Sequence, residues 1–182
     1  YGTEKSLTQT SWQPLLTDVV IFYIIKWPDW SYIGIRKERI SINPQFNNLN
    51  PEKKERIINA AIKEFVQSGF EKASTNKIVE EARISKGSLF NYFSSKKDLY
   101  LFLIDYGVQV IESIYKQIDM SETDIFKRIE KIGLIKLQIQ KKYPQVFDLL
   151  TSLSEEDSVE VKDEINKRTD SIFEEGLEKI YE

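Results

Sequence analysis

The sequence predicts an all-α protein, and three observations support this prediction. Apolar residues recur at helical spacing from residue 50 to the end of the chain. Residues that favour helix starts precede these runs, as Asn50-Pro51-Glu52 does. The composition, 41% hydrophobic and 30% charged, is typical of a folded globular protein. We therefore expect helices to account for the fold from residue 50 onward.

The first predicted helix begins at Pro51, with Asn50 as its N-cap and Glu52 in its first turn. Gly69 is placed to end this helix in a left-handed cap. The residues expected on its inner face are Ile57, Ile58, Ala61, Ile62, Phe65 and Val66.

Two short helices are predicted next. The first starts at Ser74-Thr75 and has an inner face of Ile78, Val79 and Ala82. Residues 83–87 interrupt the helical pattern. A second short helix follows near residues 86–93, with Ser85 as a candidate cap. Its apolar residues are Leu89, Phe90 and Phe93, of which Leu89 and Phe93 are expected in the core.

A long helix is predicted to follow a cap at Ser94 or Ser95 and to run to about Ile118. Three further helices are expected after it. They are a helix capped by Ser121 that continues to about Lys142, a short one from Pro144, and one over about residues 156–181. The inward residues proposed for them include Ile125, Phe126, Ile129, Ile132, Ile135, Val159, Val161 and Ile165.

Residues 1–49 differ from the rest of the chain. They contain all three tryptophans, and the apolar run at residues 19–25 suits a buried strand, although a short run of this kind can also be helical. That run is far shorter than the roughly 20 residues needed to cross a bilayer, and it lacks the features of a signal peptide. We expect an N-terminal extension of uncertain structure and role on a cytoplasmic protein without a membrane anchor.

The residue types argue against an enzyme. The chain has no cysteine and no histidine, which removes thiolate metal sites, the commonest general base and the commonest metal ligand. We find no nucleophile–base pair, no glycine-rich phosphate loop and no metal-ligand spacing. The acidic pair Glu155-Glu156 lies in a run that favours a solvated helix start. We therefore expect no catalytic site, metal or cofactor; an all-helical enzyme or scaffold is the less favoured alternative.

The charge is unevenly distributed along the chain. Residues 50–100 contain ten Lys/Arg and seven Asp/Glu, whereas residues 101–182 contain eleven and eighteen, so the net charge of −3 conceals a mildly basic segment. A basic segment attracts phosphate, and the acidic remainder keeps the protein soluble.

Residues 73–100 have the pattern of a helix-turn-helix, in which two short helices with an apolar inner face are joined by a tight turn. The second helix of such a unit lies in the major groove, with its N-terminal residues facing base edges. These residues are Ser85, Lys86, Gly87 and Ser88. Glycine lets the backbone approach DNA closely, lysine donates to guanine or phosphate, and hydroxyls at a helix start hold phosphate oxygens.

The same stretch resembles the DNA-binding domain of the tetracycline-repressor-like (TetR) family. The matching segments are IINAAIKEFVQSGF, TNKIVEEA, the turn RIS, KGSLFNYF and SSKKDLY, over about residues 53–102. Beyond residue 102 this chain and the members of the family have in common only that both are all-helical. The resemblance implies a three-helix DNA-binding domain joined by a long helix to a C-terminal helical bundle.

The resemblance also implies a role for each matching residue. Thr75 and Lys96 would contact phosphate, Lys86 and Gly87 would reach bases, and Ser85 and Ser88 would contact phosphate or base edges. Phe90, Asn91 and Tyr92 occupy the contact-rich end of the second helix. The family often has tyrosine where this chain has Phe90; without the hydroxyl, this residue packs in the core or contacts a thymine methyl group.

Members of the family are homodimers that bind palindromic operators, and many are repressors released by a small ligand. We accordingly predict an extension at 1–49, a DNA-binding domain at 50–95 and a ligand-binding and dimerisation domain at 96–182. An apolar or aromatic effector would contact Phe102, Tyr106, Tyr115, Phe126, Tyr143, Phe147 and Phe173. The alternative is a DNA-binding regulator without a small-molecule effector. By our count Glu182 falls near the end of the seventh helix, whereas the family adds two helices for its dimer interface, so we expect a different interface or an incomplete chain.

Overall fold

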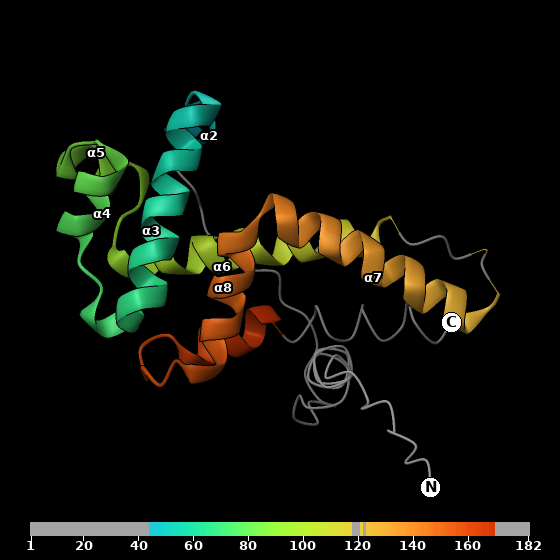
Figure 1. Ribbon diagram of the computed structural model, residues 1–182. Coiled ribbons are helices and arrows are strands. Elements are labelled where there is room, and N and C mark those ends of the chain that lie inside the picture. Colours follow the sequence, from blue (N-terminus) through green and yellow to red (C-terminus); the bar gives the residue numbers. More distant parts are fainter. Residues whose placement is uncertain (1–43, 118–120, 122, 170–182) are drawn as a thin grey trace, which may run out of the picture. The chain divides into compact units, whose positions relative to one another are not determined.

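The computed structural model describes residues 44–117, 121 and 123–169, all of which belong to one unit of the chain, residues 35–182. These residues are helical without any strand, so the all-α prediction is confirmed (Figure 1). The run at residues 19–25 lies outside the described residues. The elements are α2 (Pro44–Asn47), α3 (Pro51–Lys72), α4 (Thr75–Ala82), α5 (Lys86–Tyr92), α6 (Lys96–Tyr115), α7 (Ile125–Lys142), α8 (Pro144–Ser152), the 3₁₀ turn η1 (Leu153–Glu155) and a helix at 162–169.

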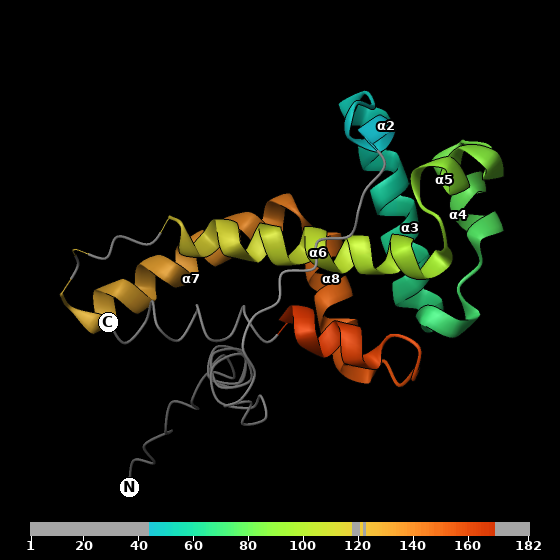
Figure 2. The ribbon, with the colours of Figure 1, turned by 180° about the vertical axis from the view of Figure 1, so that it is seen from behind.

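The long helix α6 packs against helices that precede it and helices that follow it in the chain. It contacts α3, α7 and α8, and α8 in turn contacts α3. Figures 1 and 2 show α4 and α5 together beside α3, with α7 running along α6. One continuous apolar core extends through these contacts. Its fully buried side chains include Phe46, Ile57, Ile62, Ile78, Leu89, Leu99, Leu103, Leu149 and Val161.

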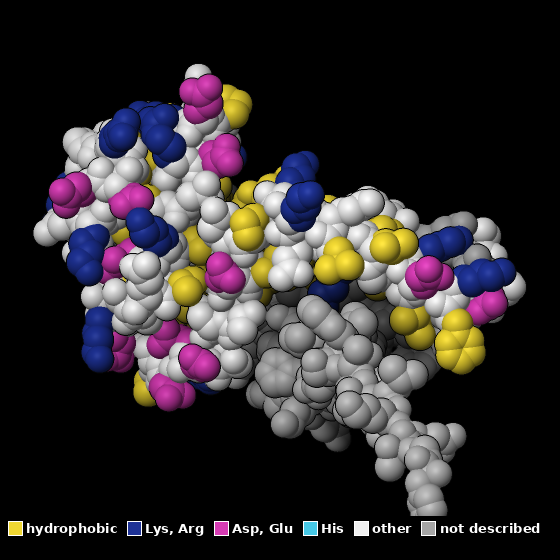
Figure 3. Space-filling model, viewed as in Figure 1, with side chains coloured by type: hydrophobic (Ala, Val, Ile, Leu, Met, Phe, Trp, Pro, Cys, Tyr) yellow, Lys and Arg dark blue, Asp and Glu magenta, His cyan; other side chains and the backbone are white. Residues whose placement is uncertain are grey.

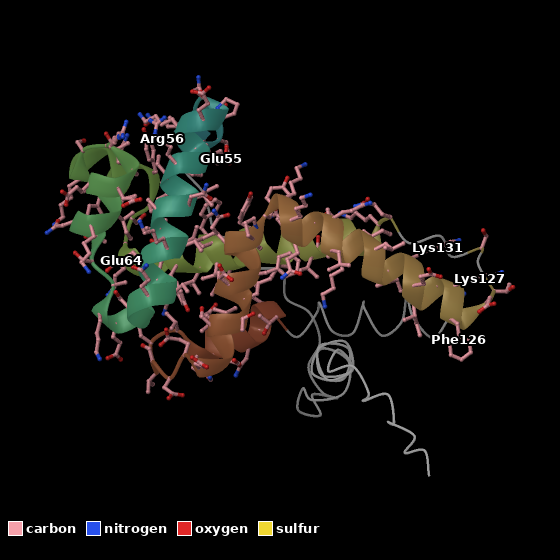
Figure 4. All side chains as sticks on the ribbon, viewed as in Figure 1. Glu55, Arg56, Glu64, Phe126, Lys127 and Lys131 are labelled. Atoms are coloured by element: carbon pink, nitrogen blue, oxygen red, sulfur yellow. The ribbon has the colours of Figure 1, made fainter. Side chains whose placement is uncertain are left out.

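A buried carboxylate holds the start of α4. Ser74 is the N-cap of α4, but its side chain makes no capping hydrogen bond. Glu64 on α3 instead accepts the Ser74 backbone N–H at 3.0 Å and the Ser68 hydroxyl at 3.1 Å, and Lys77 lies 3.6 Å from the same oxygen. Figure 4 shows Glu64 on the side of α3 near α4. A negative charge at a helix start also favours the helix dipole.

The turn between α4 and α5 is closed by a left-handed residue. Arg83 has φ 54° and ψ 49°, which is unusual for a residue other than glycine. Its N–H bonds the Glu80 carbonyl at 3.1 Å, and the Ile84 N–H bonds the Val79 carbonyl at 3.0 Å. This pair of bonds is a Schellman motif, and the packing of Ile84 and Val79 against the core completes it. The tight turn expected from the sequence is therefore present.

Gly69 interrupts α3 differently from the prediction. Its φ of 68° and ψ of 169° break the helix without forming a left-handed cap, and one more turn follows to Lys72. The break turns the Phe70 N–H away from the helix, and Glu156 accepts it at 2.8 Å. Glu156 also accepts the Ser158 N–H at 3.0 Å, so the segment after η1 is fastened to the end of α3.

Two predicted helix starts were wrong. The cap of α7 is Asp124, which accepts the Phe126 and Lys127 N–H groups, and not Ser121. The last described helix begins at residue 162 and not near 156, because residues 156–161 form the loop in which Glu156 binds Phe70. The long helix α6 ends at Tyr115, before the predicted limit at Ile118, which lies outside the described residues.

Several residues predicted to lie inside are exposed. Phe126 is 81% exposed, Ile129 37% and Val159 91%, whereas Val161 and Ile165 are buried as expected. Figure 3 shows apolar side chains along α7, and Figure 4 shows Phe126 projecting from the beginning of that helix. Ile132 and Ile135, which were also predicted to lie inside, are half-buried, so the prediction for α7 is correct for these two residues and wrong for Phe126 and Ile129. Among the described residues, no helix is long and apolar enough to span a membrane.

We predict that Glu64→Ala destabilises the protein by about 1–3 kcal/mol at neutral pH, because it leaves the Ser74 N–H without its acceptor. Burial raises the pKa of Glu64, but its hydrogen-bond donors outweigh burial, so the pKa lies below its ordinary value of 4.5. A lowered pKa stabilises the fold above the ordinary value, and this contribution is lost as the pH falls through the folded-state pKa. Urea unfolding of both proteins at neutral and acid pH measures the difference.

The matched control is Lys77→Ala, because this exposed partner should contribute no more than about 1 kcal/mol. The interpretation is contradicted if the stability difference between wild type and Glu64→Ala stays constant as the pH is lowered from neutral to well below about 4.5, the ordinary pKa of a glutamate.

Candidate nucleic-acid interface

The leading end of α5 is exposed and held by its own cap. The Ser85 hydroxyl accepts the Ser88 N–H at 3.0 Å, and the two hydroxyls lie 2.8 Å apart. Ser85, Lys86 and Gly87 are exposed and Ser88 is half-buried. A side chain at Gly87 would have Ser85 Oγ as its nearest neighbour, 3.9 Å away, so the backbone there is open to another molecule. Among the described residues, Lys86 makes no ion pair.

The opposite face of α5 is buried. Leu89 is 1% exposed and Phe93 is 3% exposed, which confirms that both belong to the core. Phe90 is 40% exposed, and Asn91 is also exposed. Of the two roles left open for Phe90, packing in the core does not fit this exposure. The helix therefore exposes Lys86, Phe90 and Asn91 on the side opposite the core.

The end of α5 contacts two elements that precede it in the chain. The Asn91 Nδ2 donates to Gln45 Oε1 of α2 at 2.6 Å. The half-buried Tyr92 receives a hydrogen bond from Lys53 Nζ at 3.4 Å, and this ammonium lies 5.9 Å from the centre of its ring. Both partners, Gln45 and Lys53, were missed in the sequence analysis because nothing local to α5 indicates them.

The two predicted phosphate contacts lie at helix starts. Thr75 is the half-buried first residue of α4. Lys96 is the first residue of α6, and its Nζ donates to the carbonyls of Glu71 at 2.9 Å and Ala73 at 3.5 Å. The same ammonium lies 4.8 Å from the centre of the Phe70 ring. A lysine ammonium has three donors, so a phosphate contact by Lys96 would be added to these bonds.

The short helix α2 lies within the predicted extension and packs on the helix-turn-helix. Phe46 is fully buried and makes edge contacts with Phe93 at 4.9 Å and with Phe102 at 5.2 Å between ring centres. The dipeptide Asn43-Pro44 is also typical of a turn or a linker. A Pro-initiated helical turn has the same local sequence, and only tertiary packing distinguishes the two.

Of the five proposed effector contacts whose side chains the structure describes, Phe102 and Tyr106 lie together, with stacked rings whose centres are 6.4 Å apart. Phe102 packs in the core with Phe46 and Phe93, and Phe126 is too exposed to line an enclosed pocket of the described residues. Phe147 is buried, and Tyr106 and Tyr143 are half-buried against the core. Phe173 and the Tyr115 side chain lie outside what the structure describes.

A cavity of about 580 Å³ opens elsewhere, between α3, α4 and α8. Its lining includes Arg56, Asn59, Lys63, Arg83, Gln145 and Asp148, and none of the seven predicted residues. Most of the residues that line it are polar or charged, but Ala60, Ile62 and Val66 line it as well. Within the described ranges, no group of three or more acidic residues is arranged to hold a metal ion.

The helix-turn-helix is similar to known regulators in sequence. The pattern of the bacterial regulatory proteins of the tetR family matches residues 57–102. The chain is 42% identical over 55 residues to YuxN, an uncharacterised HTH-type transcriptional regulator of Bacillus subtilis; the match covers 30% of this chain and 19% of YuxN. It is 37% identical over 68 residues to YerO of the same organism, covering 37% and 24% of the two chains.

The fold is similar to solved regulators over more of the chain. A tetR family transcriptional regulator from Chloroflexus aurantiacus matches with a TM-score of 0.57 and 30% identity, covering 76% of this chain and 65% of that one. The fatty acid degradation regulator FadR of Bacillus halodurans matches with a TM-score of 0.52 and 22% identity, covering 74% of this chain and 72% of FadR. At this identity the match indicates a shared fold and no shared function. The match thus spans less than a quarter of the length of YuxN and of YerO, and about two thirds of the length of these two solved structures.

We predict opposite effects for two adjacent residues of α5. Leu89→Ala should cost about 2–5 kcal/mol of stability, because it removes a fully buried side chain. Phe90→Ala should change stability by no more than about 1 kcal/mol, because that ring already faces solvent. Thermal unfolding of the two variants, followed by circular dichroism, measures both. Equal destabilisation would mean that Phe90 is a core residue and that the exposed face of α5 is wrongly identified.

Proposed function

We propose that this chain, whose helix-turn-helix is similar to that of the tetR family regulators, is a repressor that places α5 in the major groove of a palindromic operator. The observation that supports this proposal is the two-sided character of α5. Leu89 and Phe93 anchor one side in the core, and Lys86, Phe90 and Asn91 face outward on the other. The relatives are regulators and not enzymes, in keeping with the absence of histidine and cysteine.

Each outward residue of α5 has a chemistry that DNA can use. Lys86 donates to guanine O6 and N7 or to phosphate, and Asn91 offers the donor and acceptor that match the major-groove edge of adenine. Phe90 has no hydrogen-bonding group and suits a thymine methyl group. Gly87 and the Ser85 cap let the helix start approach a phosphate, where backbone N–H groups and hydroxyls bind oxygen.

Contacts to the DNA backbone would fix the register of α5. Thr75 at the start of α4 and Lys96 at the start of α6 flank the helix-turn-helix and are proposed to bind phosphates on either side of the groove. A homodimer would present two copies of α5, and successive major grooves on one face of B-DNA repeat about every 34–36 Å. The operator half-sites would then share the two-fold symmetry of the protein.

Release by a small effector is proposed to act through the contacts of α8 with α6 and α3. A Cβ at Gly107 of α6 would lie 3.1 Å from Leu150 of α8, so these helices are closely packed at this point. The Glu156 bond to the Phe70 N–H then ties the segment after α8 to the end of α3. An effector that favours a different position of α8 would shift the population towards a wrong spacing of the two α5 helices.

We predict that Lys86→Ala lowers affinity for a selected operator duplex by about 1–3 kcal/mol, the contribution of a good base contact. The duplex is obtained by selection from a random pool with the wild-type protein, and affinity is measured by fluorescence anisotropy. Lys127→Ala is the matched control, because it removes the same charge from the exposed start of α7. The assignment fails if the two variants bind the duplex equally well.

A further inference from the structure

The cavity between α3, α4 and α8 is lined by side chains from three separate parts of the sequence. One wall is a face of α3, where lining residues recur at spacings of three and four over residues 56–67, a length of about 16 Å. Glu81 and Arg83 line it from the end of α4 and the turn after it, and Gln145 and Asp148 line it from α8. Its volume of about 580 Å³ falls in the range of small-molecule sites. An occupant would contact the helix-turn-helix and α8 at once.

Most of the polar side chains that line this cavity have no partner within the described part of the chain. Lys63 and Glu81 form an ion pair of 2.9 Å. The polar lining side chains without a hydrogen bond or an ion pair to another described residue are Arg56, Asn59, Gln67, Arg83, Gln145 and Asp148. Arg56 projects from α3 (Figure 4). A guanidinium carries five N–H donors, so the two arginines offer a bound molecule many hydrogen bonds.

The backbone conformation of Arg83 is a second, independent observation. Its φ of 54° lies in the left-handed region, which glycine adopts without the steric cost that other residues incur. The turn after α4 uses only the backbone of this residue, so the turn does not require an arginine side chain. That side chain lines the cavity instead. Residues held in such conformations cluster at ligand sites.

The charges of the lining indicate the kind of ligand. Because Lys63 and Glu81 neutralise each other, two positive charges, Arg56 and Arg83, stand against one negative charge, Asp148. A single carboxylate balances this excess, and its two oxygens accept a pair of parallel N–H bonds from an arginine. A dianionic phosphate ester would instead leave an excess of negative charge next to a carboxylate.

We propose that this cavity is a binding site for a small carboxylic acid. The carboxylate pairs with the Arg83 guanidinium, and Arg56 supplies the second positive charge of the site. The carbon skeleton of the acid packs on the apolar lining residues of α3, which are Ala60, Ile62 and Val66. The inference does not rest on the proposed function, because binding of an acid requires no DNA.

The experiment titrates the full chain with two acids, benzoate and 2-naphthoate, and with their neutral amides, benzamide and 2-naphthamide, followed by ligand-detected NMR. Each acid has nearly the same shape as its amide, so a difference in affinity reports the effect of the negative charge. We expect at least one acid to bind the wild-type protein about fivefold to tenfold more tightly than its amide, because a charge-assisted pair is stronger than a neutral hydrogen bond.

Arg83→Gly is the decisive variant, because glycine adopts the same φ and the turn after α4 should stay folded. It should bind the acid no more tightly than the amide. Arg56→Gln should weaken acid binding by a smaller factor, because it leaves the Arg83 guanidinium in place. The matched control is Lys127→Ala, which removes a positive charge from the exposed start of α7 and should bind acid and amide as the wild type does. Thermal unfolding confirms that each variant is folded.

The inference is overturned if neither acid binds the wild-type protein more tightly than its amide. It is also overturned if Arg83→Gly keeps the wild-type preference for the acid, because the acid would then occupy another site. The titrations contain no DNA, so a failure of the proposed function would leave their outcome unchanged.

Discussion

The burial of Leu89 and Phe93 is the interaction on which the proposed DNA-binding surface of α5 depends. A helix of 7 residues is too short to be stable by itself, so α5 takes its orientation from these two side chains in the core. Once they are buried, the helical repeat directs Lys86, Phe90 and Asn91 outward. The Ser85 cap and the buried Phe46 ring then fix the two ends of α5, so a short element is held rigidly by its neighbours.

Polar contacts then fix the position of α5 relative to the rest of the core. Glu64 accepts the backbone N–H of Ser74, the residue before α4, and the left-handed Arg83 closes the turn between α4 and α5. Near the C-terminal end of the same helix α3, Glu156 accepts the N–H that the break at Gly69 leaves without a helical partner. The helix-turn-helix is thus connected through α3 to the segment that follows α8. A shift of α8 would therefore reach the DNA-binding helices through defined bonds.

The order of the helices and the outward face of α5 were predictable, because apolar spacing and local caps such as Asn50, Ser85 and Ser95 determine them. The cap of α7 and the exposed face of that helix could not be predicted from the sequence. Several residues near its start can cap, and an apolar stripe such as Phe126 and Leu137 does not reveal which side is packed. The Gln45–Asn91 contact joins residues far apart in sequence. No local pattern encodes it, and the role of α2 emerged only from the fold.

Amide hydrogen exchange of the full chain, with and without a selected operator duplex, tests the central claim most directly. If α5 enters the major groove, the duplex should slow exchange at the starts of α4 and α5 and in α2, while the exposed face of α7 exchanges unchanged. Slowed exchange confined to α7 and α8, with α5 exchanging as fast as in the free protein, would contradict the account.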